Sequence, residues 1–291
     1  MQPPHTRPAR WPVDLASSKL AARFSDSPVG SQIALLGVPD DTGVKLNNGR
    51  PGAAEGPSAL RAALARYGVA EPHDWSWPTV WDAGDVEVVP GDIHATHERV
   101  TEATRAIIEQ GIFPIMIGGG HDLTFPFVRA VAEVHKPMHG IYFDAHLDVR
   151  EETGSGMPFR RLIETGAADS LHIHGLDPYA NSREHIEWFS AHGGRIEGRS
   201  HDDDWLNQPT FVSLDMDVLD SAHAPGVSAH NPCGWSPRLC EQWVEQAGRH
   251  NQVKCFDIME LSPPHDQDGR TARLAARMML AFLRGFSERR S

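Results

Sequence analysis

The chain has 291 residues, a mass of 32.1 kDa and a formal net charge of −12. Its composition, 40% hydrophobic and 23% charged, is typical of a globular protein and not of a disordered one. The acidic balance argues against nucleic-acid or anionic-membrane binding, since either would favour a basic face. It leaves room for a small anionic substrate held by a few local arginines.

Cysteine content and apolar runs indicate a cytoplasmic protein. Cys233, Cys240 and Cys255 are odd in number and lack C-x-x-C spacing, which suits a reducing cytosol without a disulfide framework. No apolar run approaches the ~20 residues that cross a bilayer. Residues 1–30 are rich in Pro, Ser and Arg and lack the apolar core of a secretory signal. We expect them to form an N-terminal arm on a domain that spans residues 31–291.

Strand and helix patterns alternate along that domain. We expect strands at residues 32–38, 79–82, 113–117, 138–143, 170–174, 210–214 and 253–258. We expect helices at residues 57–67, 98–110, 123–134, 159–164, 182–191, 237–247 and 271–286. Each interval is long enough for a right-handed crossover, so the pattern predicts one α/β domain: a mostly parallel β-sheet with helices on both faces, in three layers.

Three connecting segments stand out by composition. Residues 40–52 have the Gly, Asn and Pro density of an irregular loop, and long polar loops after a strand are often functional. Gly193 and Gly194 indicate a turn. Residues 201–204 form an acidic patch that we interpret as a solvated loop and not as a ligand cluster.

Potential metal ligands follow three of the expected strands. They are His121 after residues 113–117, Asp144, His146 and Asp148 after residues 138–143, and Asp215 and Asp217 after residues 210–214. In an extended segment residues 144, 146 and 148 point to the same side. Because the carboxyl ends of parallel strands share one edge of the sheet, all six side chains should meet there.

The number and type of these ligands favour two divalent metals. Four carboxylates and two imidazoles are too many for one ion but suit two ions about 3.5–4 Å apart. Without cations the carboxylates would repel one another. Oxygen-rich ligation favours Mn²⁺ over Zn²⁺, with Ni²⁺, Co²⁺ and Fe²⁺ left open. The expected chemistry is activation of water for attack on an electrophilic carbon, which makes hydrolysis the default reaction.

Three motifs in this order resemble the arginase/agmatinase (ureohydrolase) family: residues 118–121, 144–148 and 213–220. The resemblance implies an arginase-like fold, two Mn²⁺ per subunit and a homo-oligomer. It places one ion on His121, Asp144, Asp148 and Asp215, and the other on Asp144, His146, Asp215 and Asp217. Residues 257–263 are similar to the segment whose glutamate grips the cationic C–N group of the substrate. Glu260 inherits that role.

Within this family the chain looks most like the members that split N-formimidoyl-L-glutamate in histidine degradation. Ser155 stands where arginase and agmatinase have a proton-shuttle histidine, and Arg150 stands where arginase has an asparagine at the substrate rim. A guanidinium holds a carboxylate through two parallel hydrogen bonds, so Arg150, with Arg160 or Arg161 as helper, suits a substrate with two carboxylates. Tyr179 and Asn181, on another loop, are expected to be structural.

The implied mechanism is attack of activated water on the formimidoyl carbon, with Glu260 orienting the cationic nitrogens and Asp148 relaying a proton to the departing amine. The nearest alternative is a guanidino-acid hydrolase or agmatinase-like enzyme that releases urea. A single-zinc deacylase is disfavoured by the extra ligands Asp148 and Asp217. A non-catalytic small-molecule binding protein on the same scaffold is the alternative from a different class.

Overall fold

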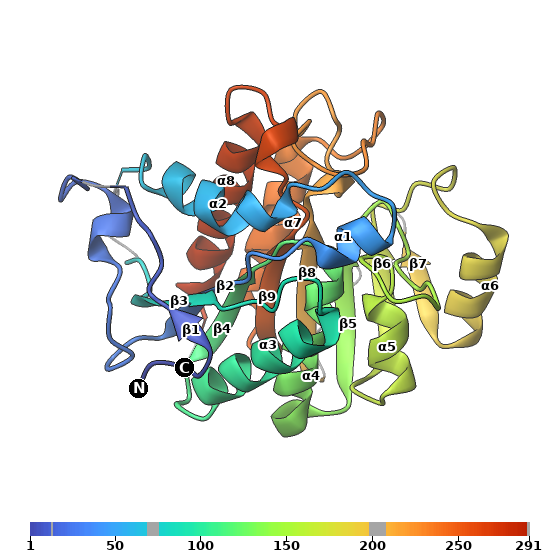
Figure 1. Ribbon diagram of the computed structural model, residues 1–291, viewed down its shortest axis with the longest axis horizontal. Coiled ribbons are helices and arrows are strands. Elements are labelled where there is room, and N and C mark those ends of the chain that lie inside the picture. The colour runs from blue at the N-terminus through green and yellow to red at the C-terminus, as the bar shows by residue number, and fades with distance from the viewer. Residues whose placement is uncertain (13, 69–75, 198–207, 290–291) are drawn as a thin grey trace.

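A twisted nine-stranded sheet runs through the centre of the molecule in the order β1-β3-β2-β4-β9-β8-β5-β6-β7 (Figure 1). The computed structural model describes residues 1–12, 14–68, 76–197 and 208–289. The strands are β1 (Thr6–Arg7), β2 (Ile33–Gly37), β3 (Val80–Val86), β4 (Phe113–Ile117), β5 (Met138–Phe143), β6 (Ala168–His174), β7 (Gly194–Glu197), β8 (Thr210–Asp215) and β9 (Val253–Met259). The pairings are parallel apart from the edge strand β1, which runs antiparallel to β3.

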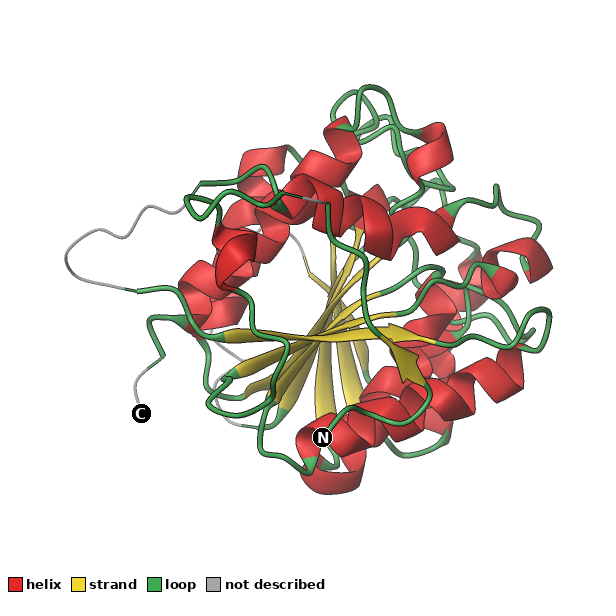
Figure 2. Ribbon diagram, turned by 60° about the vertical axis from the view of Figure 1, so that its left-hand side comes forward, coloured by secondary structure: helices red, strands yellow, loops and turns green. Residues whose placement is uncertain are grey.

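Helices cover both faces of this sheet (Figure 2). They are α1 (Thr42–Leu46), α2 (Gly56–Leu64), α3 (Ile93–Ile108), α4 (Thr124–His135), α5 (Pro158–Glu164), α6 (Arg183–Ala191), α7 (Pro237–Arg249) and α8 (Arg270–Phe286). Two hydrophobic clusters fill the space between the layers. One joins α2, α7 and α8 to the sheet, and the other joins α3, α4, α5 and α6 to its opposite face. The predicted single α/β domain with a mostly parallel sheet is confirmed.

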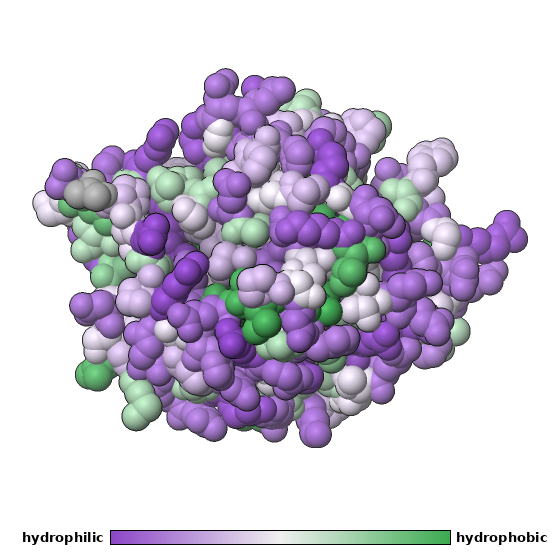
Figure 3. Space-filling view, in the orientation of Figure 1, coloured by the Kyte–Doolittle hydropathy of each residue, from purple (hydrophilic) through white to green (hydrophobic). Residues whose placement is uncertain are grey.

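The alternation of side chains along the strands explains this sandwich. On β4, Ile115 and Ile117 belong to the first cluster while Met116 between them belongs to the second. Strands β2, β5 and β8 are buried along their whole length, as expected for parallel strands with helices on both faces. The outer surface is correspondingly polar. The face in Figure 3 is mainly hydrophilic, with a smaller hydrophobic area near its centre.

Several elements differ from the sequence-based expectation. Residues 40–52 contain the short helix α1. Gly193 lies in a turn with φ +80°, as expected for the Gly193–Gly194 pair. Gly194 is already the first residue of β7, a strand that the sequence did not predict. Pairing with β6 produces this short edge strand, and a four-residue segment has too little pattern to reveal it. The acidic patch at residues 201–204 lies outside the described residues.

The N-terminal residues contribute a short strand to the sheet. Within the predicted N-terminal arm, Thr6 and Arg7 extend the sheet at its edge by pairing with β3. The arm and the domain boundary at residue 31 remain predictions. None of the helices in the described ranges is long and apolar enough to cross a membrane.

A buried arginine ties α2 to the sheet. The Arg61 side chain is 1% exposed, and its Nε lies 2.8 Å from Asp82 Oδ2 while its Nη1 lies 2.6 Å from Asp85 Oδ1. Both carboxylates come from β3. Removing one partner of a buried ionic cluster leaves uncompensated charge inside the protein.

We expect Arg61→Leu to lower the free energy of unfolding by about 3–5 kcal/mol, measured by urea denaturation. The matched control is Arg105→Leu, because Arg105 pairs with Glu133 on the surface with about two-fifths of each side chain exposed. That change should lower the free energy of unfolding by less than about 1 kcal/mol. Equal losses in the two variants would contradict the role assigned to Arg61.

Candidate metal and active site

The carboxyl ends of β4, β9, β8 and β5 lie side by side in the sheet. His121 follows β4, Glu260 follows β9 and Asp144 follows β5. Asp215 is the last residue of β8, and Asp217 comes just after that strand. Segments far apart in the sequence therefore deliver their polar side chains to one edge, as predicted. This edge is where open α/β sheets usually bind ligands.

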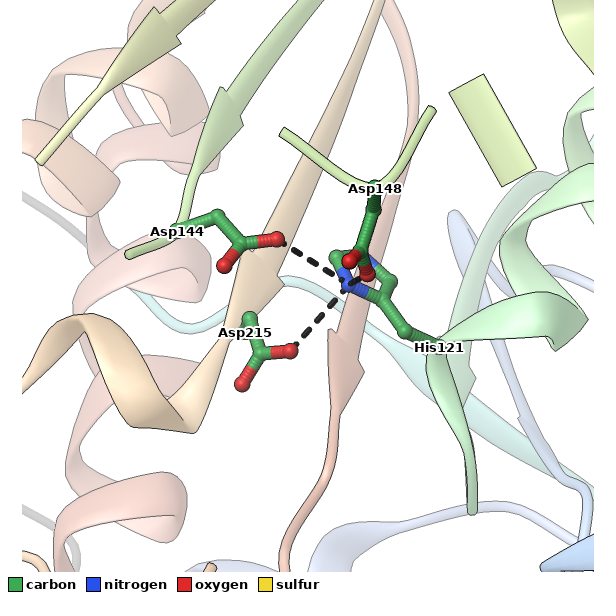
Figure 4. Close-up of side chains that lie close together, drawn as sticks. All are labelled: His121, Asp144, Asp148 and Asp215. Carbon is green, nitrogen blue, oxygen red and sulfur yellow. Dashed lines mark ion pairs between the residues drawn. The ribbon is translucent and has the colours of Figure 1, made fainter. Parts of the chain in front are cut away.

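The first group of side chains surrounds one imidazole nitrogen (Figure 4). His121 Nδ1 lies 3.2 Å from Asp144 Oδ2, 3.0 Å from Asp148 Oδ2 and 3.1 Å from Asp215 Oδ2. Yet neither Nδ1 nor Asp144 Oδ2 makes a hydrogen bond of acceptable geometry with any described residue. One N–H cannot point at three oxygens, so these atoms converge on a space between them and not on one another.

The second group adjoins the first through a shared carboxylate. His146 Nδ1 lies 3.0 Å from Asp217 Oδ2 and 3.5 Å from Asp144 Oδ1. Asp144 thus turns one oxygen to each group. In each group, one candidate ligand atom per residue lies within 4.8 Å of all the others. Asp215 belongs to the first group alone in this geometry, whereas the family resemblance led us to expect it in the second group as well. Its Oδ1 accepts the backbone N–H of Asp217 at 2.8 Å.

The backbone brings residues 144–148 together in a different way from the one the sequence suggested. β5 ends at Phe143, and the following segment is a loop in which Asp148 has φ +48°, so alternation along an extended strand is the wrong explanation. Instead, a tight turn brings the side chains together, and in this turn the backbone N–H of His146 donates to Asp144 Oδ1 at 2.6 Å. The left-handed backbone at Asp148 then returns its carboxylate toward His121.

Asn181 braces this loop from outside. Its Oδ1 accepts the N–H of Leu147 at 2.9 Å, and its Nδ2 donates to the carbonyl of Ala145 at 2.8 Å. The structural role expected for Asn181 agrees with these contacts. Tyr179, two residues earlier, is 98% exposed.

The glycine run before His121 allows a close approach of two loops. A Cβ at Gly119 would lie 1.7 Å from the carbonyl oxygen of Asp40, and one at Gly118 would lie 2.0 Å from Met259 Sδ. At Gly119 the obstacle is backbone, so no larger residue fits there, and at Gly118 a larger residue would displace the Met259 side chain. The glycines therefore let His121 sit directly at the end of the sheet.

Burial and mutual repulsion control ionisation in the cluster. Burial, and then the charges of Asp148 and Asp217, raise the pKa of Asp144 to about 6. Burial and neighbouring carboxylates likewise raise the pKa of Asp215 well above its usual range. Burial alone would lower the pKa of His121, but its three carboxylate neighbours raise it well above the usual value. Such a buried anionic group is stable with compensating cations, so the donor set fits divalent metal ions.

A cavity of about 260 Å³ opens above the cluster. Its lining includes Asn47, Asn48, Gly49, Arg50, His146, Asp148, Arg150, Ser155, Asp215, Asp217, Ser228, Ala229 and Glu260. Arg150 and Ser155 thus reach the cavity from the loop between β5 and α5. Arg160 is not among the lining residues, since its guanidinium bonds Glu164 at 2.8 Å and Glu151 at 3.3 Å and lies over the Trp188 ring. Its helix turns it away from the cavity, and Arg161 likewise pairs with Glu164.

Sequence reasoning did not assign a role to the residues behind His121. His121 Nε2 contacts Ser213 Oγ at 3.0 Å, and that hydroxyl donates to Asp257 Oδ1 at 2.5 Å. Thr124 donates to the other oxygen of Asp257 at 3.0 Å. This buried chain orients the imidazole so that Nδ1 faces the carboxylates, as carboxylate–histidine pairs do around metal sites. Ser213 and Asp257 stand inside the quoted motifs, but only the packed strands show what they touch.

Comparison with known proteins supplies independent evidence. The sequence model of the arginase family matches residues 31–284. The formimidoylglutamase of Aromatoleum aromaticum is 34% identical over 91% of this chain and 85% of its own length. The human mitochondrial guanidino acid hydrolase is 31% identical over 97% of this chain and 86% of its own length. The crystal structure of Trypanosoma cruzi formiminoglutamase with Mn²⁺ superposes with a TM-score of 0.85 at 28% identity, covering 94% of this chain and 99% of that one.

Replacing Asp144 by Asn tests the electrostatic account in chelator-treated protein. The pKa of Asp144 in the folded protein is about 6, above its ordinary value of 3.8. Ionisation of Asp144 therefore lowers the stability of the fold as the pH rises from 3.8 to about 6, and the full loss is reached above about pH 6. We expect Asp144→Asn to be more stable than the parent above about pH 6, by about 1–3 kcal/mol, and equally stable below about pH 4. Urea denaturation over this pH range measures the difference.

Added Mn²⁺ should reverse that order, because a cation that binds the folded state stabilises the intact ligand set more. Asp268→Asn, at an exposed position, serves as the control and should behave like the parent. A destabilised Asp144→Asn variant at every pH without metal would contradict the repulsion argument.

Proposed function

The chain belongs to the arginase family, and we propose that it is a two-metal hydrolase that splits N-formimidoyl-L-glutamate into L-glutamate and formamide. The family and the class of enzyme predicted from the sequence, a formimidoylglutamase-like hydrolase of linear amidines, are confirmed. The metal, the substrate and the role of each residue are the proposal.

The observation that carries the proposal is the set of carboxylates around His121 Nδ1. Three oxygens and one nitrogen at 3.0–3.2 Å, without matching hydrogen bonds, have the composition of a divalent cation site. We assign one ion to the group of His121, Asp144, Asp148 and Asp215, and a second to the group of Asp144, His146 and Asp217. Oxygen-rich ligation and the similar Mn²⁺ structure support manganese.

When bound, two such ions activate a water molecule for attack on the formimidoyl carbon. Glu260 lies beside His121 and is 5% exposed. Its Oε1 accepts the backbone N–H of His121 at 2.9 Å, and its Oε2 has no hydrogen-bond partner among the described residues. Burial raises the pKa of Glu260 to about 8. A cationic amidine lowers that pKa again, so the carboxylate can hold and orient the two substrate nitrogens.

Asp148 is our candidate for proton transfer. Its side chain is 14% exposed and lines the cavity, unlike the fully buried Asp144. We assign it the relay of a proton to the amine of the departing glutamate. Ser155 is 9% exposed where an arginase shuttle histidine would stand, which leaves this transfer to Asp148.

Arg150 supplies the argument for an acidic substrate. Arg150 lines the cavity and has no ion-pair partner in the described part of the chain. The backbone N–H of Arg150 donates to the carbonyl of Gly156 at 2.8 Å, and this hydrogen bond fixes the loop that carries Arg150. Two parallel hydrogen bonds from a guanidinium suit a carboxylate, and formimidoylglutamate carries two carboxylates. The reaction would belong to cytoplasmic histidine degradation, in a homo-oligomer if this chain follows its family.

A guanidino acid hydrolase is the second candidate, because the human enzyme of that name is similar over nearly the whole chain. Both substrate types present a planar C–N cation to Glu260 and a carboxylate to Arg150. Their products differ. Release of urea from a guanidino acid would support the second candidate, whereas glutamate and formamide would support the first.

We expect the protein with added Mn²⁺ to turn over formimidoylglutamate, and Asp148→Ala and His146→Ala to lower kcat by at least about 100-fold with loss of bound metal. Formamide release and metal analysis measure the two effects. Asp268→Asn is the control. If both variants kept full metal content and full turnover, the site assignment would be wrong.

For Arg150→Gln we expect a rise in KM for formimidoylglutamate of about 10- to 100-fold, because a charge-assisted pair to a substrate carboxylate is lost. Formamidine, which has no carboxylate, should be hydrolysed by the variant as by the parent. Arg161→Gln is the matched control, since Arg161 pairs with Glu164. An unchanged KM for formimidoylglutamate in Arg150→Gln would assign the substrate carboxylates elsewhere.

A further inference from the structure

Two loops that contact each other both line the cavity. Residues 47–50, here called the first lip, follow α1, and residues 227–230, the second lip, lie between β8 and α7. Asn47, Asn48, Gly49 and Arg50 line the cavity from the first lip, and Ser228 and Ala229 line it from the second. The shape of the cavity therefore depends on how these two segments are held together.

Arg50 makes the connections between the lips. Its backbone N–H donates to Ser228 Oγ at 2.9 Å, and its Nε donates to the carbonyl oxygen of Ser228 at 2.8 Å. Its Nη2 donates to the carbonyl of Val227 at 2.6 Å and lies 2.9 Å from His230 Nε2. One residue thus contacts three residues of the opposite lip.

These contacts use the guanidinium differently from that of Arg150. Arg50 has no carboxylate partner in the ranges that the structure describes, and two of its three guanidinium nitrogens are already bonded to backbone carbonyls. A flat guanidinium with five fixed donors suits several carbonyls at once. Arg50 is therefore built into the wall of the cavity, whereas Arg150 lines the same cavity without an ion-pair partner in the described ranges.

The lips are also packed too closely to shift without consequence. A Cβ at Gly49 would lie 2.8 Å from Ser228 Oγ and 2.9 Å from Val44 Cγ1. Asn48 has a left-handed backbone at φ +57°, which the bonds from Asn48 N–H to Lys45 and from Gly49 N–H to Val44 maintain. These bonds hold the first lip in place, and Arg50 attaches it to the second.

We propose that Arg50 is a positioning residue that clamps the two lips together. The clamp thereby fixes the position of the substrate in the cavity. The inference rests on the proposed function only in taking this cavity as the active site. Loss of the clamp would misplace any substrate, whatever its charge. A displacement of about 1 Å can lower the rate about 100-fold. A direct contact between Arg50 and a substrate carboxylate would affect acidic substrates alone.

The test compares Arg50→Gln and Arg50→Lys with the parent on formimidoylglutamate and on the uncharged-tail substrate N-propylformamidine. We expect kcat/KM to fall about 10- to 100-fold on both substrates in Arg50→Gln, and Arg50→Lys to recover little, since an ammonium cannot span Ser228 and Val227. Arg150→Gln should impair the acidic substrate only. A loss in Arg50→Gln confined to formimidoylglutamate would overturn the proposal.

Amide hydrogen exchange provides a readout that does not depend on turnover. We expect faster exchange in Arg50→Gln at residues 47–50 and 227–230, with the exchange of β5 and β8 unchanged. Arg99→Gln is the matched control, because Arg99 also donates to a backbone carbonyl, that of Glu87, outside the cavity. Unchanged exchange in both lips would refute the clamp. Absence of amidine turnover in the parent, with faster exchange in the variant, would instead refute the proposed function.

Discussion

Four carboxylates within one small cluster repel one another, and the rest of this structure is arranged around that repulsion. Asp144 is fully buried, and Asp215 and Asp217 are 2% and 3% exposed. Water cannot screen charges in such a place, so the pKa of Asp144 and that of Asp215 rise. A fold can keep such a group only if its backbone is held firmly enough that the side chains cannot move apart, and if cations compensate the charge when the protein functions.

The surrounding contacts supply that firmness from several directions. Asn181 fixes the loop of residues 145–147 by two hydrogen bonds, and a third bond, to the carbonyl of Asp177, holds Asn181 itself in place. The chain from His121 through Ser213 to Asp257 fixes the imidazole from behind. Gly119 permits the close contact with Asp40 that places His121 at the sheet edge. None of these groups needs to touch a substrate, yet each determines where a ligand atom lies.

The lining of the cavity combines acidic side chains with two arginines. The acidic residues are Asp148, Asp215, Asp217 and Glu260, and the arginines are Arg50 and Arg150. This combination is the basis for proposing a substrate with a planar cation and carboxylates. The two lips joined by Arg50 come from loops 177 residues or more apart in sequence, so the shape of the cavity depends on the packing of distant segments.

Much of this protein follows from its sequence. The alternation of apolar strand and helix patterns predicts the parallel sheet, and ligand-type residues after three strands predict a common site, because parallel strands end at one edge. The sequence does not show that residues 144–148 turn out of the strand, that Arg160 is drawn to Glu164 and Glu151, or that β7 extends the sheet. These outcomes depend on contacts between segments distant in the chain. Residue types determine which chemistry is available, and tertiary packing decides which side chains are free to use it. Arg50 and Arg150 both line the cavity, but the guanidinium of Arg50 is already bonded to the carbonyls of Val227 and Ser228.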